Sequence, residues 1–103
     1  MKREKRIEEN ERRFDACREA VDGLLSALDK YEKCLGDLSR LTDYYGSGTW
    51  LGDFEADEAG KLPPDLKRGV LSEDGVYNML ENNREAEISM LRVLTGLAKM
   101  RTE

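Results

Sequence analysis

The chain has 103 residues, of which 38% are charged, and its formal net charge at neutral pH is -5. This length allows one small domain, residues 1–103, and the acidic balance disfavours nucleic acid and anionic membranes as partners. No apolar run approaches the roughly 18 residues that a membrane span requires, and Met1 leads into charged residues rather than a signal segment. We therefore expect a cytoplasmic protein with no membrane contact.

Charge is unevenly distributed at the start of the chain. Residues 1–13 contain six Lys or Arg and four Glu, so this head carries +2 while the rest of the chain carries -7. A solvated helical extension is the simpler interpretation of such a segment. The alternative is a basic arm that contacts a nucleic acid or an acidic partner.

A seven-residue repeat of mostly apolar positions begins at Ile7 and predicts a long helix over about residues 3–45. The first column of this repeat contains Ile7, Phe14, Val21, Leu28, Leu35 and Thr42, and the second contains Asn10, Cys17, Leu24, Tyr31, Leu38 and Tyr45. Ala20, Ala27, Cys34 and Leu41 flank these columns on one side, and Leu25 flanks them on the other. The apolar stripe is thus wider than a two-stranded coiled coil needs, which favours a helical bundle.

Cys17 and Cys34 occupy core or core-edge positions of this helix. We expect both to be reduced and to act as small buried apolar groups, with a disulfide as the minority alternative.

A structured connector is predicted over residues 46–71. Gly46 is suited to the left-handed turn just past a helix end. Asp53 can cap a helical turn over residues 54–59 that ends at Gly60, and Pro63 and Pro64 can start a second turn over residues 65–68.

The second helix is predicted over about residues 72–101. Ser72 is the clearest cap in the chain, and Leu71 and Val76 can form a hydrophobic staple around it. Near its end this helix is apolar on several sides, at Met90, Leu91, Val93, Leu94, Leu97 and Met100. We therefore expect an all-α fold, a long antiparallel helical hairpin that a second copy completes as a homodimeric four-helix bundle.

Two stretches of the connector, Trp50-Leu51-Gly52-Asp53-Phe54-Glu55-Ala56-Asp57-Glu58-Ala59-Gly60-Lys61-Leu62-Pro63 and Asp65-Leu66-Lys67-Arg68-Gly69-Val70-Leu71-Ser72-Glu73-Asp74-Gly75-Val76-Tyr77, carry a family likeness. The sequence resembles the bacterial family catalogued as domain of unknown function 4298, and the flanking helices fit this likeness. The resemblance implies a small, mostly helical bacterial cytoplasmic protein. It implies no activity and no catalytic residue.

Several kinds of chemistry are disfavoured by the residues themselves. The sequence contains no histidine, the usual general base and a common transition-metal ligand, and its two cysteines do not make a zinc site. The acidic run from Asp53 to Glu58 begins like a calcium loop, but Glu58 stands where that loop needs glycine and Pro64 where it needs glutamate. We expect no enzyme activity, no metal and no cofactor.

The candidate contact residues are Trp50, Asp53, Phe54, Glu55, Asp57, Lys67, Arg68 and Tyr77. Five of the seven aromatic residues lie within or beside the connector, and the simpler interpretation is a small secondary core that fixes the connector to the helix ends. The alternative is an aromatic protein-contact surface rimmed by charge.

These observations favour a non-enzymatic helical protein-interaction module whose connector presents the recognition surface. One alternative is a small acidic inhibitor or anti-defence protein of a phage or mobile element, which would act on a nucleic-acid enzyme by presenting carboxylates in place of phosphates. Nucleic-acid binding through the basic head is a third, weaker hypothesis.

Overall fold

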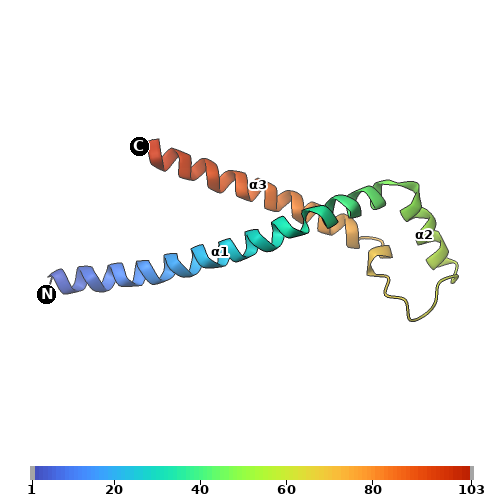
Figure 1. Cartoon of the computed structure of the whole chain (residues 1–103), viewed down its shortest axis with the longest axis horizontal. Coiled ribbons are helices and arrows are strands. Elements are labelled where there is room, and N and C mark those ends of the chain that lie inside the picture. The colour runs from blue at the N-terminus through green and yellow to red at the C-terminus, as the bar shows by residue number, and fades with distance from the viewer. Residues whose placement is uncertain (1, 103) are drawn as a thin grey trace. The chain divides into compact units, whose positions relative to one another are not determined.

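The computed structural model describes residues 2–102, and all the regular secondary structure in this range is helical. Helix α1 spans Lys2–Gly46, α2 spans Gly48–Glu58, a single 3-10 turn η1 spans Gly69–Leu71, and α3 spans Gly75–Thr102 (Figure 1). The predicted all-α class is confirmed. The chain divides within α1 into two compact units, Met1–Ser39 and Arg40–Glu103, which are described in turn.

The first unit consists of the N-terminal part of α1. Its charged side chains pair along the helix surface, with Arg18 3.2 Å from Asp15 and Lys33 2.9 Å from Asp29. The large apolar residues of the repeat are exposed, at Ile7, Phe14, Val21, Leu24, Leu25, Leu28 and Leu35. Cys17 and Cys34 are free thiols but are exposed, so the expected burial is not observed.

The first helix ends near the predicted place, but Gly46 is its last helical residue and does not adopt the expected left-handed turn. Helix α2 begins earlier than its sequence suggested. Gly46 closes α1, and Ser47 stands at the position before α2 in extended conformation, with its hydroxyl donating to the Tyr44 carbonyl at 2.8 Å. The expected Asp53 cap is wrong, because Asp53 lies inside α2 and its carboxylate accepts a hydrogen bond from the Tyr44 hydroxyl.

The end of α2 follows the predicted pattern. Gly60 adopts a φ of 70°, in the left-handed region that glycine favours. The Gly60 amide donates to the Asp57 carbonyl and the Lys61 amide to the Ala56 carbonyl, both at 3.0 Å. This pair of bonds is the Schellman arrangement, which satisfies carbonyls that the helix itself leaves unpaired.

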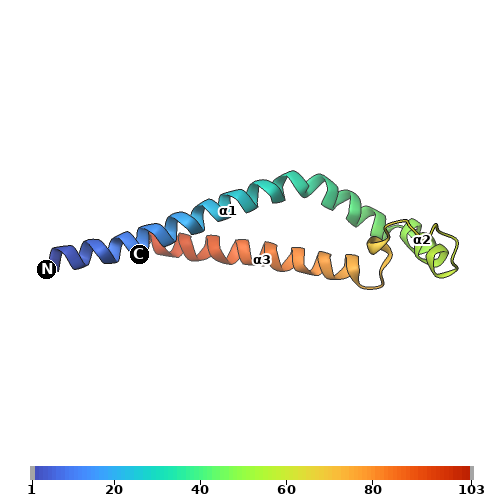
Figure 2. The same ribbon diagram turned by 90° about the horizontal axis from the view of Figure 1, so that it is seen from below.

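The helical turn predicted over residues 65–68 is not formed. The chain makes a turn there, with the Leu66 amide donating to the Pro63 carbonyl at 3.2 Å, and the 3-10 turn lies further on at η1. The cause is Arg68, whose guanidinium takes the carbonyls of Pro63 and Pro64 that a continuing helix would have used. Figure 2 shows this segment turning back beside α2 before α3 begins.

Ser72 accepts a hydrogen bond at the start of α3 as predicted, but α3 begins only at Gly75, so Asp74 and not Ser72 directly precedes the helix. The Ser72 hydroxyl accepts a hydrogen bond from the Gly75 amide at 3.1 Å. Leu71 and Val76, at 6% and 4% exposure, are the two buried apolar residues among those that the structure describes. They form a small core where η1 meets α3.

Candidate functional site

One face of α2 carries Trp50, Phe54 and Asp57, whose spacing of four and then three residues aligns them along the helix. The Trp50 and Phe54 rings stack with centroids 5.2 Å apart, and Tyr45 at the end of α1 meets Trp50 edge-on at 4.9 Å. We call these three rings the aromatic cluster. Both geometries are favourable arrangements of aromatic quadrupoles.

Trp50 also joins α2 to the segment before α3. Its indole N–H donates to the Val70 carbonyl at 2.9 Å, and the side chain is half-buried. A tryptophan in contact with rings on one side and a backbone carbonyl on the other is held by its own chain. This geometry supports the secondary-core interpretation of the aromatic cluster.

Arg68 holds the loop after α2 in place. Its Nη1 lies 2.5 Å from the Asp57 carboxylate, and both side chains are largely shielded, at 31% and 23% exposure. Its Nη2 donates to the carbonyls of Pro63 at 2.8 Å and Pro64 at 2.9 Å, and its Nε donates to Leu66 at 3.2 Å. The planar guanidinium thus satisfies several acceptors at once, which a lysine could not do.

A second polar contact links α1 to α2. The Tyr44 hydroxyl donates to the Asp53 carboxylate at 2.6 Å. This hydrogen bond, together with burial and the negative charge of Asp53, raises the pKa of Tyr44 to about 12.

The structure places the remaining candidate residues differently. The Glu55, Lys67 and Tyr77 side chains are exposed and make no hydrogen bond or ion pair with other residues in the range 2–102. The structure therefore brings Trp50 together with Phe54, and Asp57 together with Arg68, but does not gather all the predicted contact residues into one site. Sequence reasoning missed the backbone acceptors Val70 and Pro63, because a carbonyl leaves no residue signature.

The model of the family described as Domain of unknown function (DUF4298) matches residues 7–93. The chain belongs to this family. No curated protein and no solved structure matches the chain. The DUF4298 match includes most of α1, all of the connector and the first part of α3, so every predicted contact residue lies inside it.

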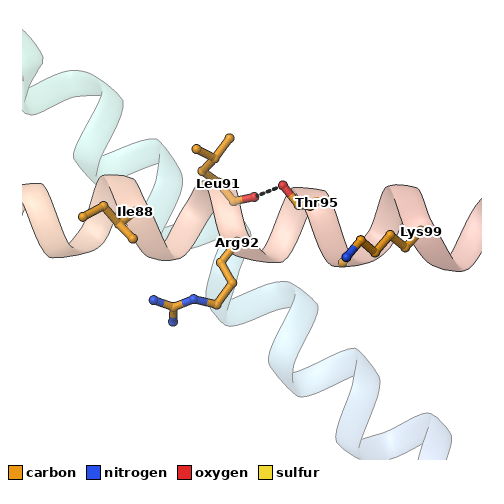
Figure 3. A pocket seen from close by; sticks show the side chains of 6 residues that line it. Ile88, Leu91, Arg92, Thr95 and Lys99 are labelled. Carbon is orange, nitrogen blue, oxygen red and sulfur yellow. Dashed lines mark hydrogen bonds between the residues drawn. The ribbon is translucent and has the colours of Figure 1, made fainter.

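A shallow groove on the C-terminal half of α3 lies across the end of the DUF4298 match, with three of its six lining residues inside the match and three beyond it. Six residues of α3 line it, namely Ile88, Leu91, Arg92, Thr95, Gly96 and Lys99. Figure 3 shows Leu91 and Arg92 pointing to opposite sides of the helix, with the Thr95 hydroxyl bonded to the Leu91 carbonyl at 2.8 Å. The sequence analysis did not identify this groove. The sequence did contain one signal for the groove, because Gly96 lies between two cations, Arg92 and Lys99, that are seven residues apart.

Two kinds of feature are absent from residues 2–102. No three His, Cys, Asp or Glu side chains gather there in a group that could hold a metal ion. In the same range no helix combines the length and apolar character needed to cross a membrane.

Proposed function

We propose that this DUF4298 protein is a non-enzymatic helical protein-interaction module that self-associates through the apolar faces of α1 and α3. The observation that carries the proposal is the distribution of its apolar side chains. Within residues 2–102, two apolar residues are buried, whereas seventeen large hydrophobic residues are exposed. Exposed apolar surface on this scale is typical of a protein that associates with other helices.

The C-terminal half of α3 shows the need for partners most clearly. At about 100° per residue, the apolar side chains of residues 88–102 cover about 240° of the helix circumference. They are Ile88, Met90, Leu91, Val93, Leu94, Leu97, Ala98 and Met100. A single neighbouring helix covers a stripe of about 100°. More than one helix is therefore needed to bury this surface, which favours a homodimer.

In this proposal the connector acts mainly as a rigid end piece, because the aromatic cluster and Arg68 are occupied by contacts within the chain. The exposed candidates Glu55 and Lys67 of the connector, and Tyr77 near the start of α3, are available to a further protein partner. No observation in the structure favours the acidic-inhibitor alternative, which stays a prediction from size and charge.

Two further parts of the proposal have their own support. The non-enzymatic assignment is supported by the absence of histidine from the chain. The proposed cytoplasmic location is supported by the two cysteines, which are free thiols in the structure, because a reducing compartment keeps thiols free.

The test is self-association of purified protein, measured by sedimentation velocity over a wide concentration range. We expect the wild type to dimerise and Leu94→Glu to be monomeric, because Leu94 is 64% exposed at the middle of the apolar arc. Asn78→Glu is the matched control, since it places the same carboxylate at an exposed position of α3 outside residues 88–102. A wild type that remains monomeric at high concentration, or equal effects of the two variants, would contradict the proposal.

A further inference from the structure

The groove on α3 has the form of a coiled-coil hole. Four of its lining residues, Arg92, Thr95, Gly96 and Lys99, stand at positions i, i+3, i+4 and i+7 of the helix. This is the set of four neighbours into which one side chain of a facing helix inserts. Gly96 has no side chain to fill the space between its neighbours, and the position of its missing Cβ faces open space. All six lining residues belong to α3, so the groove is open to a partner.

The charge around the groove restricts what can enter it. Residues 88–102 contain three basic residues and no acidic one, and two of the three, Arg92 and Lys99, stand at opposite ends of the four-residue hole. A matching helix must therefore present an apolar side chain with a carboxylate near each end. Because Arg92 and Lys99 are seven residues apart, the two carboxylates must be seven residues apart as well.

A segment of α1 meets these requirements. Residues 19–29 contain three acidic residues and no basic one. Leu25 lies at the centre of this segment and is 62% exposed. Asp22 comes three residues before it and Asp29 four residues after it, so the two carboxylates have the required seven-residue spacing.

We propose that Leu25 of a second copy inserts into the groove beside Gly96, with Asp22 and Asp29 paired to Arg92 and Lys99. Each copy carries one groove and one Leu25 segment, so two identical contacts can close a symmetric dimer. This inference rests on the proposed function, because it names the partner and the contact through which the helices self-associate.

The present neighbours of these aspartates do not prevent the contact. Asp29 pairs with Lys33 at 2.9 Å, but both side chains are strongly exposed, at 60% and 76%. Exposed pairs of this kind contribute little and can be exchanged for a partner across an interface. Asp22 makes no ion pair with another residue of the range 2–102.

The same spacing recurs at Glu4, Ile7 and Glu11, which provides a natural comparison. Six Lys or Arg surround that triplet within residues 1–13, and they would face the cations of the groove. Like charges across a contact are destabilising, so this segment is the poorer match.

Charge exchange tests the pairing. One variant carries Asp22→Lys and Asp29→Lys, and the other carries Arg92→Glu and Lys99→Glu. We expect each variant alone to dimerise on the order of tenfold to a hundredfold more weakly than wild type at low ionic strength. An equimolar mixture of the two should regain wild-type affinity as a heterodimer, measured by native mass spectrometry and sedimentation. Glu4→Lys with Glu11→Lys, the matched control, should not weaken the dimer.

Filling the groove tests the apolar part. Gly96→Leu should raise the thermal stability of the helix, because the new side chain meets no neighbour and glycine is a poor helix former. The same change should weaken dimerisation, because it occupies the space meant for Leu25. Gly52→Leu, a glycine of helix α2 with open space around it and outside both contact segments, is the control that should stabilise without this loss.

The outcomes separate this inference from the proposed function. Suppose that wild type dimerises and Leu94→Glu abolishes the dimer, as the proposed function requires. If charge reversal and Gly96→Leu then have no effect on dimerisation, the groove assignment is wrong and the proposed interaction module still stands. If each charge variant is weakened but the mixture does not recover, the pairing is not between copies and the inference is overturned. A monomeric wild type would overturn both.

Discussion

The connector and the C-terminal half of α3 use their side chains in opposite ways. In the connector, the rings of Trp50 and Phe54 and the guanidinium of Arg68 contact other groups of the same short segment. In residues 88–102 of α3, large apolar side chains such as Leu91 and Met100 are 66% and 73% exposed. A segment that satisfies its own groups becomes rigid, whereas one that leaves them exposed keeps its surface for a partner. Variants in the connector should therefore alter folding, and variants in α3 should alter association.

The largest effect on folding is expected at Trp50. Trp50→Ala removes two ring contacts and the hydrogen bond to Val70, and should lower the free energy of unfolding by about 3 kcal/mol. Trp50→Phe keeps a ring but removes the donor, so it should cost about 1 kcal/mol. Urea unfolding followed by circular dichroism gives both values. Equal costs for the two variants would show that packing contributes nothing beyond the hydrogen bond.

Arg68 should show a somewhat smaller effect. Arg68→Ala should lower the free energy of unfolding by about 2 kcal/mol, because it leaves the half-buried Asp57 and the proline carbonyls without their donor. Arg68→Lys should recover part of this loss, since it keeps the charge but not the planar fork. Lys67→Ala, at the exposed neighbouring position, is the control and should change stability little. A Lys67 effect as large as that of Arg68 would contradict the role given to the guanidinium.

The smallest effect is a dependence on alkaline pH. Because the pKa of Tyr44 is raised from 10.0 to about 12 in the folded chain, the Tyr44–Asp53 contact contributes its full stability below pH 10.0 and loses it as the pH rises toward 12. Wild type should therefore lose free energy of unfolding as the pH rises from 10.0 to about 12, and Tyr44→Phe should not show this loss. In the absorbance of tyrosinate, the variant should show one tyrosine fewer that loses its proton at the upper end of this pH range. An unchanged late titration in the variant would assign the raised pKa to another tyrosine.

The sequence predicted those parts of the fold that depend on local chemistry. The end of α2 at Gly60 and the Ser72 hydrogen bond both involve residues whose side chain, or lack of one, decides the backbone locally. The pair of Leu71 and Val76 was likewise predictable, because a staple spans only a few residues.

The sequence did not predict features that depend on contacts between segments. Asp53 looks like a helix cap in isolation, but Tyr44 provides a donor nine residues away and α2 extends past it. The turn expected after Pro64 is absent because the Arg68 side chain competes for the same carbonyls. The candidate contact residues were predicted as a group. The sequence did not show that Trp50 is held by contacts within the chain while Lys67 is exposed, because this difference depends on contacts between segments.

The position of the single tryptophan has a practical consequence for spectroscopy. Trp50 reports on the connector, because its indole contacts the rings of Phe54 and Tyr45 and donates to the Val70 carbonyl. The Gly96 groove lies on a helix that carries no tryptophan. Intrinsic fluorescence can therefore follow unfolding of the connector, while a dye coupled to one of the exposed thiols of α1 follows dimerisation. The two processes can thus be recorded as separate optical signals in one cuvette.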